Sequence, residues 1–502
     1  MTRRAMRPVL ATAALFTAAA LALSGCAPSS DGGGDDTART TLNIGMATEI
    51  SALIPWQQQG YNFSQNAGFT IFDTLLKFDD DGEAVPVLAT GWEISDDQTQ
   101  TTFTIRDDAK FHNGDPVTAA DVAYSIDIRA NPDSIAKYGS WALFGADMYG
   151  SVEATDDTTV VVTTTSAFRL IDAMRRVMVV PEGSADDANF GQNPIGSGPF
   201  AFVSFDPGVK LTVKANEDYW GGVPAIKTLT FNTIADIGAQ ASALRSGDID
   251  ALYDIKSAEY AQVAGVEGLK ELQTGTFFSW WMTQTGHGLT ASPEGRAALR
   301  YLFDTNQMNA SAYGGEGIAT WNPFDETPVG IGQAVDVTYD PVKAGELLEA
   351  AGLQGETLSI LALEGLEDSE RMGQLLEQAA IEAGLTVDFR VLSVPDYLAT
   401  TYSDPTWDGI VYGAGTLPFP FYDAFDYMIL GNPDMAAMIA QMRGASDDEL
   451  ATLVIDAQKM MIDDTLVLPA FVAPVRTLIP TGLSGVEATT FGDVRWGEAT
   501  FE

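Results

Sequence analysis

Motifs that carry covalent catalysis are absent or incomplete in this chain of 502 residues. Ser134 and Lys137 fit the Ser-x-x-Lys pattern of penicillin-interacting enzymes, but the Lys-Thr-Gly element that accompanies this pattern there is missing. The sequence also lacks the Gly-x-Ser-x-Gly elbow of serine hydrolases and the Gly-x-x-x-x-Gly-Lys loop that binds nucleotide phosphates. We therefore predict that the protein is not an enzyme.

Side chains that bind transition metals are equally few. Cys26 is the only cysteine, which excludes an intramolecular disulfide and a thiolate zinc cluster, and the two histidines, His112 and His287, are far apart in sequence. Carboxylate sites for calcium or magnesium stay open among 69 acidic residues. The Asp-Asp-Asp-Gly segment at 79–82 does not have the spacing of a calcium loop, because Lys77 occupies the first ligand position. We expect no metal and no cofactor.

The chain is strongly acidic, with 69 Asp and Glu against 27 Lys and Arg and a formal net charge of −42. This charge repels phosphate backbones, so we exclude nucleic acid as a partner. We expect most of the acidity to form a solvated surface, and an acidic site for a cationic ligand is the alternative. Hydrophobic residues make up 46% of the sequence, which is typical of a globular chain and not of a disordered one.

Residues 1–26 have the three parts of a secretory signal: a basic start with three arginines, an apolar stretch over 8–23, and small residues before a cleavage point. The apolar stretch is short for a membrane span. The final Leu-Ser-Gly-Cys resembles the lipobox of bacterial lipoproteins, in which the cysteine, here Cys26, is acylated and becomes the new N-terminus. Residues 27–40 are rich in Gly, Ser, Asp and Thr, which predicts a flexible tether.

The rest of the chain mixes strand and helix signals, which predicts an α/β fold, and its length suggests two to four domains. Segments rich in β-branched or apolar residues predict strands at 42–47, 101–105, 158–165, 228–233 and 250–255. Capping patterns predict helices that begin after Thr118, Asp236 and Asp340. Gly247 and Gly352 are expected to end the second and third of these helices.

The second half of the chain continues this alternation. Strands at 358–363 and 386–394, with a helix at 369–383 between them, predict a βαβ unit whose strands are parallel. Ser446 and Glu449 form a capping box that opens a long helix. An α/β pattern in both halves suggests two lobes with a cleft between them.

Five sequence blocks occur in a fixed order. They are 87–126, which contains Gly-Trp-Glu-Ile-Ser-Asp-Asp and Lys-Phe-His-Asn-Gly-Asp-Pro-Val-Thr, 194–200 (Pro-Ile-Gly-Ser-Gly-Pro-Phe), 216–222 (Asn-Glu-Asp-Tyr-Trp-Gly-Gly), 243–250 (Ala-Leu-Arg-Ser-Gly-Asp-Ile-Asp) and 339–353. Together they resemble the family 5 solute-binding proteins of ABC transporters, the dipeptide, oligopeptide and nickel receptor group. The resemblance extends over nearly the whole chain after the predicted tether.

This resemblance implies a two-lobed, periplasmic-binding-protein-like α/β fold of type II with an extra domain in lobe one. Lobe one would be 41–274, with the extra subdomain at about 77–182, lobe two would be 275–474, and 475–502 would return to lobe one. The implied partners are a small solute, an ABC permease with its ATPase subunits, and the membrane through the lipid anchor. The protein would be a monomer on the outer face of the plasma membrane or in the periplasm.

The resemblance also implies three segments that contact the solute. Strand alternation puts the rings of Trp280 and Trp281 on opposite faces, so only one of them is expected to reach the cleft, and Trp281 is preferred. The implied ligand-binding residues are Trp56, Gln57 and Tyr61 after the first strand; Trp281, Thr283 and Gln284 in the strand that enters lobe two; and Tyr412, Gly413, Gly415, Phe419, Tyr422 and Asp423 in a lobe-two loop.

In peptide-binding members an aspartate near the third segment holds the ammonium group of the ligand. This chain has Thr416 and Leu417 in the equivalent stretch, with Asp423 further on. Either Asp423 takes that role or the solute is not a free peptide. An aromatic, proline-rich loop suits sugars, aromatic cations and apolar peptide side chains about equally. Oligopeptides are the first expectation; an opine, a metal chelate or another non-peptide solute, and a secreted lipoprotein hydrolase with a carboxylate pair, are the alternatives.

Overall fold

The computed structural model describes residues 39–50, 52–57, 63–79, 82–140, 142–175, 177–320, 338–364, 366–393, 396–397, 400, 406–415, 432–489 and 492–502. The predicted signal peptide, Cys26 and most of the predicted tether lie outside these residues, as do Tyr61, Phe419, Tyr422 and Asp423. In the described part of the chain, no helix combines the length and the apolar character that crossing a membrane requires.

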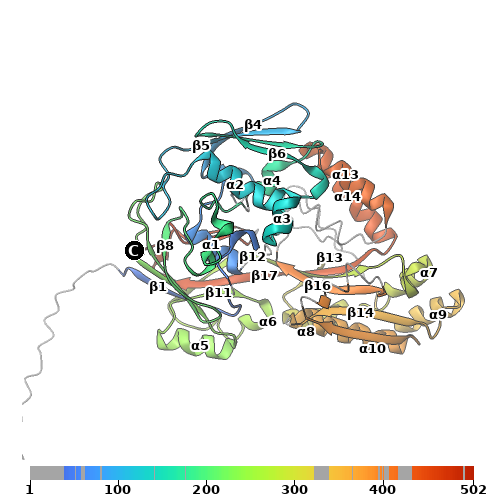
Figure 1. Ribbon diagram of the computed structural model, residues 1–502. Helices are drawn as coiled ribbons and strands as arrows, with labels where there is room; N and C mark the ends of the chain where they lie inside the picture. The colour runs from blue at the N-terminus through green and yellow to red at the C-terminus, as the bar shows by residue number, and fades with distance from the viewer. Residues whose placement is uncertain are drawn as a thin grey trace, which may run out of the picture. The chain divides into compact units, whose positions relative to one another are not determined.

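A mixed sheet runs through the described part of the chain (Figure 1). Its strands are β1 (Thr41–Met46), β8 (Phe200–Asp206), β9 (Lys210–Ala215), β10 (Thr228–Thr233), β11 (Ala251–Ile255), β12 (Leu269–Thr283), β13 (Ile318–Thr320), β14 (Thr357–Leu363), β15 (Thr386–Leu392), β16 (Gly409–Gly415) and β17 (Val467–Pro480). Their spatial order is β15-β14-β16-β12-β17-β11-β1-β10-β9-β8, with β13 beside β17.

The two long strands β12 and β17 belong to both lobes. The first part of β12, Leu269 to Gln273, pairs with Pro480 to Arg476, and its second part, from Thr276 onward, pairs with Pro474 to Val467. The register shifts between Gln273 and Thr276, so the ladder is interrupted where the chain passes from one lobe to the other. The predicted lobe boundaries, 274/275 and 474/475, both fall within these strands.

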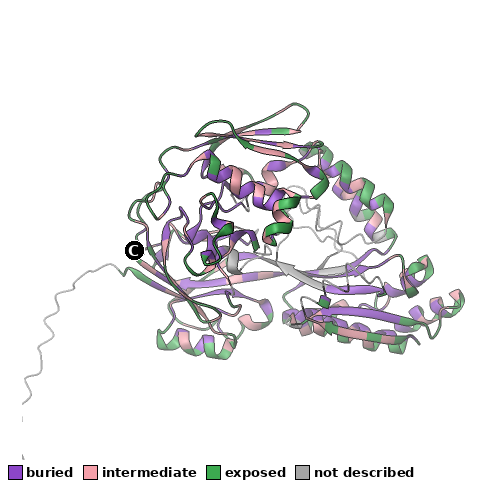
Figure 2. Ribbon diagram, viewed as in Figure 1, coloured by how far each residue is buried: buried purple, intermediate pink, exposed green. Residues whose placement is uncertain are grey.

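Lobe one is built on β1, which lies between β10 and β11 and is parallel to both. Its main apolar core includes Ile44, Phe72, Leu229 and Trp496 and involves α1 (Phe63–Ile71). A second cluster packs α5 (Ile237–Ser246) against Leu252 and Leu478. The central strands β1 and β11 are therefore largely buried on both sides, while the helices turn exposed faces outward (Figure 2).

The extra domain has its own antiparallel sheet, in the order β4-β5-β7-β6, and its own core around Phe103, Val122 and Phe144. Its elements are β2 (Leu76–Phe78), β3 (Ala84–Pro86), β4 (Ala89–Ile94), β5 (Gln100–Ile105), β6 (Tyr149–Ala154), β7 (Thr159–Thr164), α2 (Ala119–Ala130), α3 (Pro132–Tyr138) and α4 (Leu170–Met174). The predicted capping box of α2 is present, because the side chains of Thr118 and Asp121 each accept from the other's backbone N–H.

Lobe two has helices on both faces of its sheet, and each face has a separate core. One face carries α7 (Pro293–Leu299), α8 (Thr305–Tyr313), α9 (Pro341–Ala351) and α10 (Glu367–Glu382), and the other carries α13 (Pro433–Met442) and α14 (Asp447–Asp463) (Figure 1).

Short elements complete the described part of both lobes and of the extra domain. They are α6 (Ser257–Tyr260), β18 (Leu483–Ser484), β19 (Glu487–Ala488), β20 (Val494–Arg495), β21 (Thr500–Phe501) and the 3-10 turns η1 (Pro55–Gln57), η2 (Ala146–Met148), η3 (Ser184–Asp186), η4 (Phe190–Gln192) and η5 (Gly288–Ala291).

The local sequence signals predict most of these elements. Asp236 caps α5 by accepting from Ala239 N–H, and Gly247 ends the helix with a left-handed φ of 79°, a conformation that costs glycine little. β14 and β15 are parallel neighbours, as the βαβ pattern predicts, and the helix between them begins at Glu367, two residues earlier than expected. The result is a two-lobed α/β fold with an extra domain in lobe one.

Candidate ligand-binding site

The carboxyl ends of strands from both lobes lie close to the point where β12 and β17 pass from one lobe to the other. In lobe one, β11 ends with Ile255 opposite Arg476, next to the carboxyl end of parallel β1. In lobe two, β16 ends with Gly415 opposite Phe277. Ligands of open α/β sheets bind outside the carboxyl ends of the strands. The junction between the lobes is therefore the candidate site.

The first predicted segment, in η1, divides into a buried and an exposed residue. Trp56 is buried in the lobe-one core, with its ring 5.1 Å from that of Phe190. Gln57 is exposed, and its Nε2 donates to the carbonyl of Tyr138 over 2.8 Å. Tyr138 is the last residue of α3, so Gln57 ties the segment after β1 to the extra domain. Gln57 is the more accessible of the two residues to a ligand.

The second segment alternates as predicted, but both tryptophan rings are buried. Trp280 belongs to the core under α13 and α14, and Trp281 to the core under α8 and α10, and neither has exposed surface. The indole Nε1 of Trp281 donates to Thr283 Oγ1 over 2.9 Å, and its ring meets Phe303 edge-on. The structure thus places Trp281 in a core and not on an accessible surface. Helices cover both faces of this sheet, so alternation separates two cores and not a core from a cleft.

Thr283 and Gln284 lie at the end of β12 and are also buried. Thr283 Oγ1 donates to the carbonyl of Thr465 over 2.8 Å, and the backbone N–H of Gln284 donates to the carbonyl of Asp408 over 2.8 Å. Both residues therefore fix the far end of β12 against neighbouring loops.

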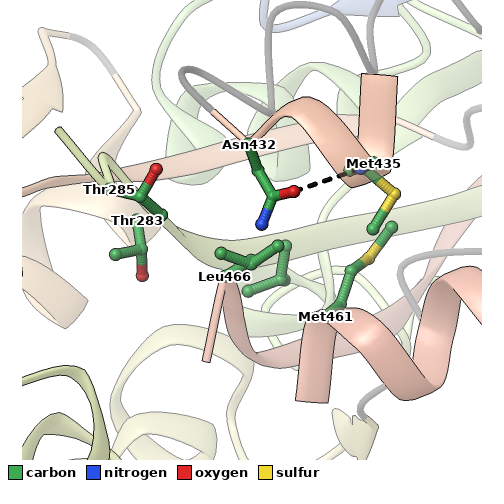
Figure 3. A pocket seen from close by; sticks show the side chains of 7 residues that line it. Thr283, Thr285, Asn432, Met435, Met461 and Leu466 are labelled. Carbon is green, nitrogen blue, oxygen red and sulfur yellow. Dashed lines mark hydrogen bonds between the residues drawn. The ribbon is translucent and has the colours of Figure 1, made fainter. Parts of the chain in front are cut away.

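A small pocket lies beside Thr283 (Figure 3). It is lined by Thr283, Thr285, Asn432, Met435, Met461, Leu466 and Val467, and its lining is mostly apolar. The space it encloses is about that of one water molecule. Asn432 caps α13 there by accepting from the N–H groups of Asp434 and Met435. This pocket is a packing gap between β12 and α13 and is too small for a solute.

The third segment lies alongside the second. In the β12–β16 ladder, Tyr412 is opposite Trp280, Gly413 opposite Ser279, and Gly415 opposite Phe277. Two of the three predicted segments are therefore neighbours at the crossing point. The remaining residues of this segment, Phe419, Tyr422 and Asp423, follow β16 and lie outside the described residues.

A further contact joins the extra domain to lobe two, and the sequence reasoning missed it. The backbone N–H of Arg169 donates to the carbonyl of Arg443 over 2.9 Å, and its Nη1 donates to the carbonyl of Ala445 over 3.2 Å. The guanidinium of Arg443 lies 3.6 Å from a carboxylate oxygen of Asp147. We call this set, Asp147 and Arg169 against Arg443 and Ala445, the interlobe contact. It bridges residues that no local pattern connects.

His112, in the sequence block of the extra domain that resembles the family, has a structural role. His112 Nε2 lies 3.0 Å from the carbonyl of Gly198, and burial lowers the pKa of His112, which favours a neutral ring. Within the described residues, no group of three or more His, Cys, Asp or Glu is placed to hold a metal ion. The junction of two lobes supports capture of a solute by contact with both of them.

Comparison with known proteins agrees with this reading. Residues 83–435 match the model of the family described as bacterial extracellular solute-binding proteins, family 5 Middle. Protein XP55 of Streptomyces lividans is 30% identical over 362 residues, which cover 71% of this chain and 65% of XP55. The chain thus matches slightly less than two thirds of the length of that relative.

Two solved structures show the same fold. The periplasmic binding protein DppA of Helicobacter pylori, in complex with the peptide STSA, is similar with a TM-score of 0.79 at 21% identity, over 93% of this chain and 98% of that one. The protein AgaA of A. tumefaciens R10, in complex with agropinic acid, is similar with a TM-score of 0.78 at 21% identity, over 92% and 99% of the two chains.

Proposed function

Because the chain belongs to the family 5 bacterial extracellular solute-binding proteins, we propose that it captures a small solute between its lobes and delivers it to the permease of an ABC importer. The observation that carries this proposal is the pair of strands β12 and β17, which join two lobes whose strand ends face each other. A receptor of this kind binds without turnover, and the ATPase subunits of the importer would supply the energy.

The mechanism we propose is a shift in population between lobe arrangements. A solute that touches both lobes favours the arrangement in which they are close, and by only as much as its contacts differ between the two states. The interrupted ladder between Gln273 and Thr276 provides a place for β12 to bend. The interlobe contact would form only when the extra domain and lobe two are together, so it would add to closure.

For the solute, we propose an oligopeptide or a peptide-like molecule. DppA, which has the same fold, was solved with a peptide, and this supports the peptide class. Leu417, where peptide-binding members have an aspartate, favours a second candidate, a non-peptide solute such as an opine, and AgaA was solved with agropinic acid. The residues proposed to contact the solute are Gln57, Tyr61, Tyr412, Gly413, Gly415, Phe419, Tyr422 and Asp423, with Trp56, Trp281, Thr283 and Gln284 in support behind them.

We further propose that the protein is a monomeric lipoprotein outside the cytoplasm. The signal pattern of residues 1–26 and the single cysteine, Cys26, support acylation, with residues 27–40 as the tether. Replacing Cys26 with Ser should move the protein from the membrane fraction to the soluble fraction. Membrane association that is unchanged in Cys26→Ser would contradict the anchor.

Native mass spectrometry of the body expressed from Asp31 tests the binding role and the solute class together. A mass increment of a few hundred daltons that is lost on denaturation would support capture of a solute, and a distribution of peptide masses would select the peptide class. If no solute is retained and none binds from a panel of peptides, opines and sugars, the receptor role fails. Turnover of a model peptide or glycoside would favour the hydrolase alternative.

A further inference from the structure

A polar cavity of about 460 Å³ lies beside β17 at the junction of the lobes, and residues of α5, α6, α8 and α10 line it. Figure 1 shows these four helices below the long strands β12 and β17. Lobe one contributes Ala47, Thr48, Ala235, Asp236, Ile237, Asp254, Lys256, Ser257, Ala258, Glu259 and Gln262, and lobe two contributes Ala312, Tyr313, Asp368, Arg371, Ala473 and Pro474. None of the predicted solute-contacting residues lines it. We call it the hinge cavity. Its volume is in the range of sites for small organic ligands.

Asp254 faces this cavity from a distorted part of β11. The pairing of β11 with β17 shifts register between Leu252 and Ile255, and Asp254 has a left-handed φ of 61°. Such conformations cost free energy in residues other than glycine and cluster at functional sites. The residue is only 6% exposed. Burial raises its pKa to about 7, with the charges of Glu259 and Asp368 adding to this and that of Lys256 opposing it.

Asp368 faces the same cavity from the other lobe, in the first turn of α10. It is 5% exposed, and its Oδ2 has no hydrogen-bond partner in the described part of the chain. Its Oδ1 lies 3.8 Å from the Nζ of Lys256, which is too long for a hydrogen bond. Buried carboxylate oxygens in folded proteins are almost always hydrogen-bonded. The unpartnered oxygen indicates that a donor from outside the chain belongs here.

The charges of the lining residues indicate that this hydrogen-bond donor carries a positive charge. Four acids, Asp236, Asp254, Glu259 and Asp368, face two bases, Lys256 and Arg371. Asp236 caps α5, but Asp254 is buried and one oxygen of Asp368 has no donor among the described residues. A metal ion is disfavoured, because no cluster of three ligating side chains is formed in this part of the chain. The cavity is also much larger than a metal ion needs.

We propose that the hinge cavity binds a small protonated organic amine, whose ammonium group donates to the carboxylates of Asp254 and Asp368. The ammonium group donates to the Asp368 oxygen that has no donor among the described residues, and its charge offsets that of buried Asp254. Because its two acceptors belong to different lobes, the bound amine bridges them beside β17. Occupancy is then coupled to the lobe arrangement, and through it to solute binding in the proposed solute cleft.

The probe for this site is 1,4-diaminobutane, titrated calorimetrically at pH 8 into the chain that carries Cys26→Ser and so remains unlipidated. We expect one molecule to bind, and 1,4-butanediol, which has the same length without the charge, not to bind. Asp254→Asn and Asp368→Asn should each weaken binding about tenfold or more, because each removes a charge-assisted hydrogen bond. Asp107→Asn, which removes an exposed acid in the extra domain, should leave the affinity within about twofold.

A variant that is expected to tighten binding separates a specific effect from loss of binding through misfolding. Lys256→Gln removes the cation that competes with the amine for Asp368, so it should tighten binding of 1,4-diaminobutane. The proposal is overturned if the diamine does not bind, if the diol binds equally well, or if neither Asn variant weakens binding while both are at least as thermally stable as the parent. Binding that is lost only on substitution of Asp423 would place the amine in the proposed solute cleft instead, and would overturn the hinge site while leaving the receptor function intact.

Discussion

Two buried aspartates of lobe one differ in how their charge is stabilised. Asp73 accepts from the hydroxyl of Tyr219 over 3.0 Å and from the indole N–H of Trp220 over 2.9 Å. Burial raises its pKa to about 6, although these donors and the charge of Arg495 oppose the shift. The pKa of Asp254, which is shifted by burial and by neighbouring charges alone, is raised to about 7. The same side chain is therefore a structural acceptor at one position and an uncompensated charge at the other.

Replacing Asp254 with Asn should stabilise the protein at alkaline pH. The folded-state pKa of about 7 lies above the ordinary value of 3.8, so the stability given by the protonated carboxyl is present below pH 3.8 and is lost as the pH rises to 7. Asn avoids this loss and tolerates the left-handed conformation. At 1.36 kcal/mol per pKa unit, we expect a gain of about 4 kcal/mol at pH 8 and a smaller gain at pH 5. Urea unfolding at both pH values checks this, with Asp107→Asn as the control; equal gains at the two pH values would contradict it.

Replacing Asp73 with Asn should have the opposite effect. Asn offers one oxygen and an NH₂ group, so Trp220 or Tyr219 loses its acceptor and a buried donor is left unpaired. We expect a loss of about 1–3 kcal/mol at pH 7. The measurement is the urea midpoint of the purified variant. A midpoint equal to that of the parent would mean that the network contributes nothing.

At the scale of elements, the close packing of β12 on β16 explains why Trp281 is a core residue. A Cβ at Gly409 would lie 1.9 Å from the Cζ2 of the Trp281 ring. The ring cannot move away easily, because its Nε1 is bound to Thr283 and its edge rests on Phe303. The absence of a side chain at position 409 therefore makes room for the indole.

Gly409→Ala should destabilise lobe two by about 3 kcal/mol, the upper end of the usual cost of overpacking. Combining it with Trp281→Phe should cost less than the sum of the two single changes, since the smaller ring leaves room for the methyl group. Urea unfolding of the four proteins gives the coupling. Gly482→Ala, at a position with no heavy atom within 4 Å of the added Cβ, is the control. Strict additivity would show that the ring and position 409 do not compete for space.

The elements were far more predictable from sequence than the site. Caps such as Asp236 and Gly247 act within one helical turn, so a local pattern is enough to place α5. The start of α13 at Asn432 and Pro433 carries the same kind of signal as Asp340 and Pro341, and could have been predicted in the same way. Alternation correctly separated Trp280 from Trp281 but could not tell which face meets a ligand. Asp254 and Asp368 belong to different lobes and come together only because β12 and β17 join the two lobes. No local sequence pattern contains this contact.

At the scale of the whole molecule, the interlobe contact should contribute to solute affinity. Arg169→Met removes the hydrogen bond to the carbonyl of Ala445 but keeps the backbone bond to Arg443. One hydrogen bond that exists only in the closed arrangement contributes about 1 kcal/mol to the free energy of closure. Its loss should weaken binding of the solute found by mass spectrometry about fivefold. Calorimetry with that solute is the measurement.

Asp147→Asn is the matched control, because its carboxylate is exposed and only 3.6 Å from Arg443, a geometry that contributes little. We expect its affinity within about twofold of the parent. If Arg169→Met and Asp147→Asn bind the solute equally well, the contact does not act in closure.

The late position of β17 in the chain has a consequence for how the protein folds as it is made. β17 pairs with β11, and Asn66 in α1 donates to the carbonyl of Gly492 and accepts from the N–H of Val494. A chain that emerges with its N-terminus first exposes the apolar surface of lobe one until these residues follow. Contacts so distant in sequence slow folding, because the intervening loop must close before they form. Lobe one is thus begun first and completed last.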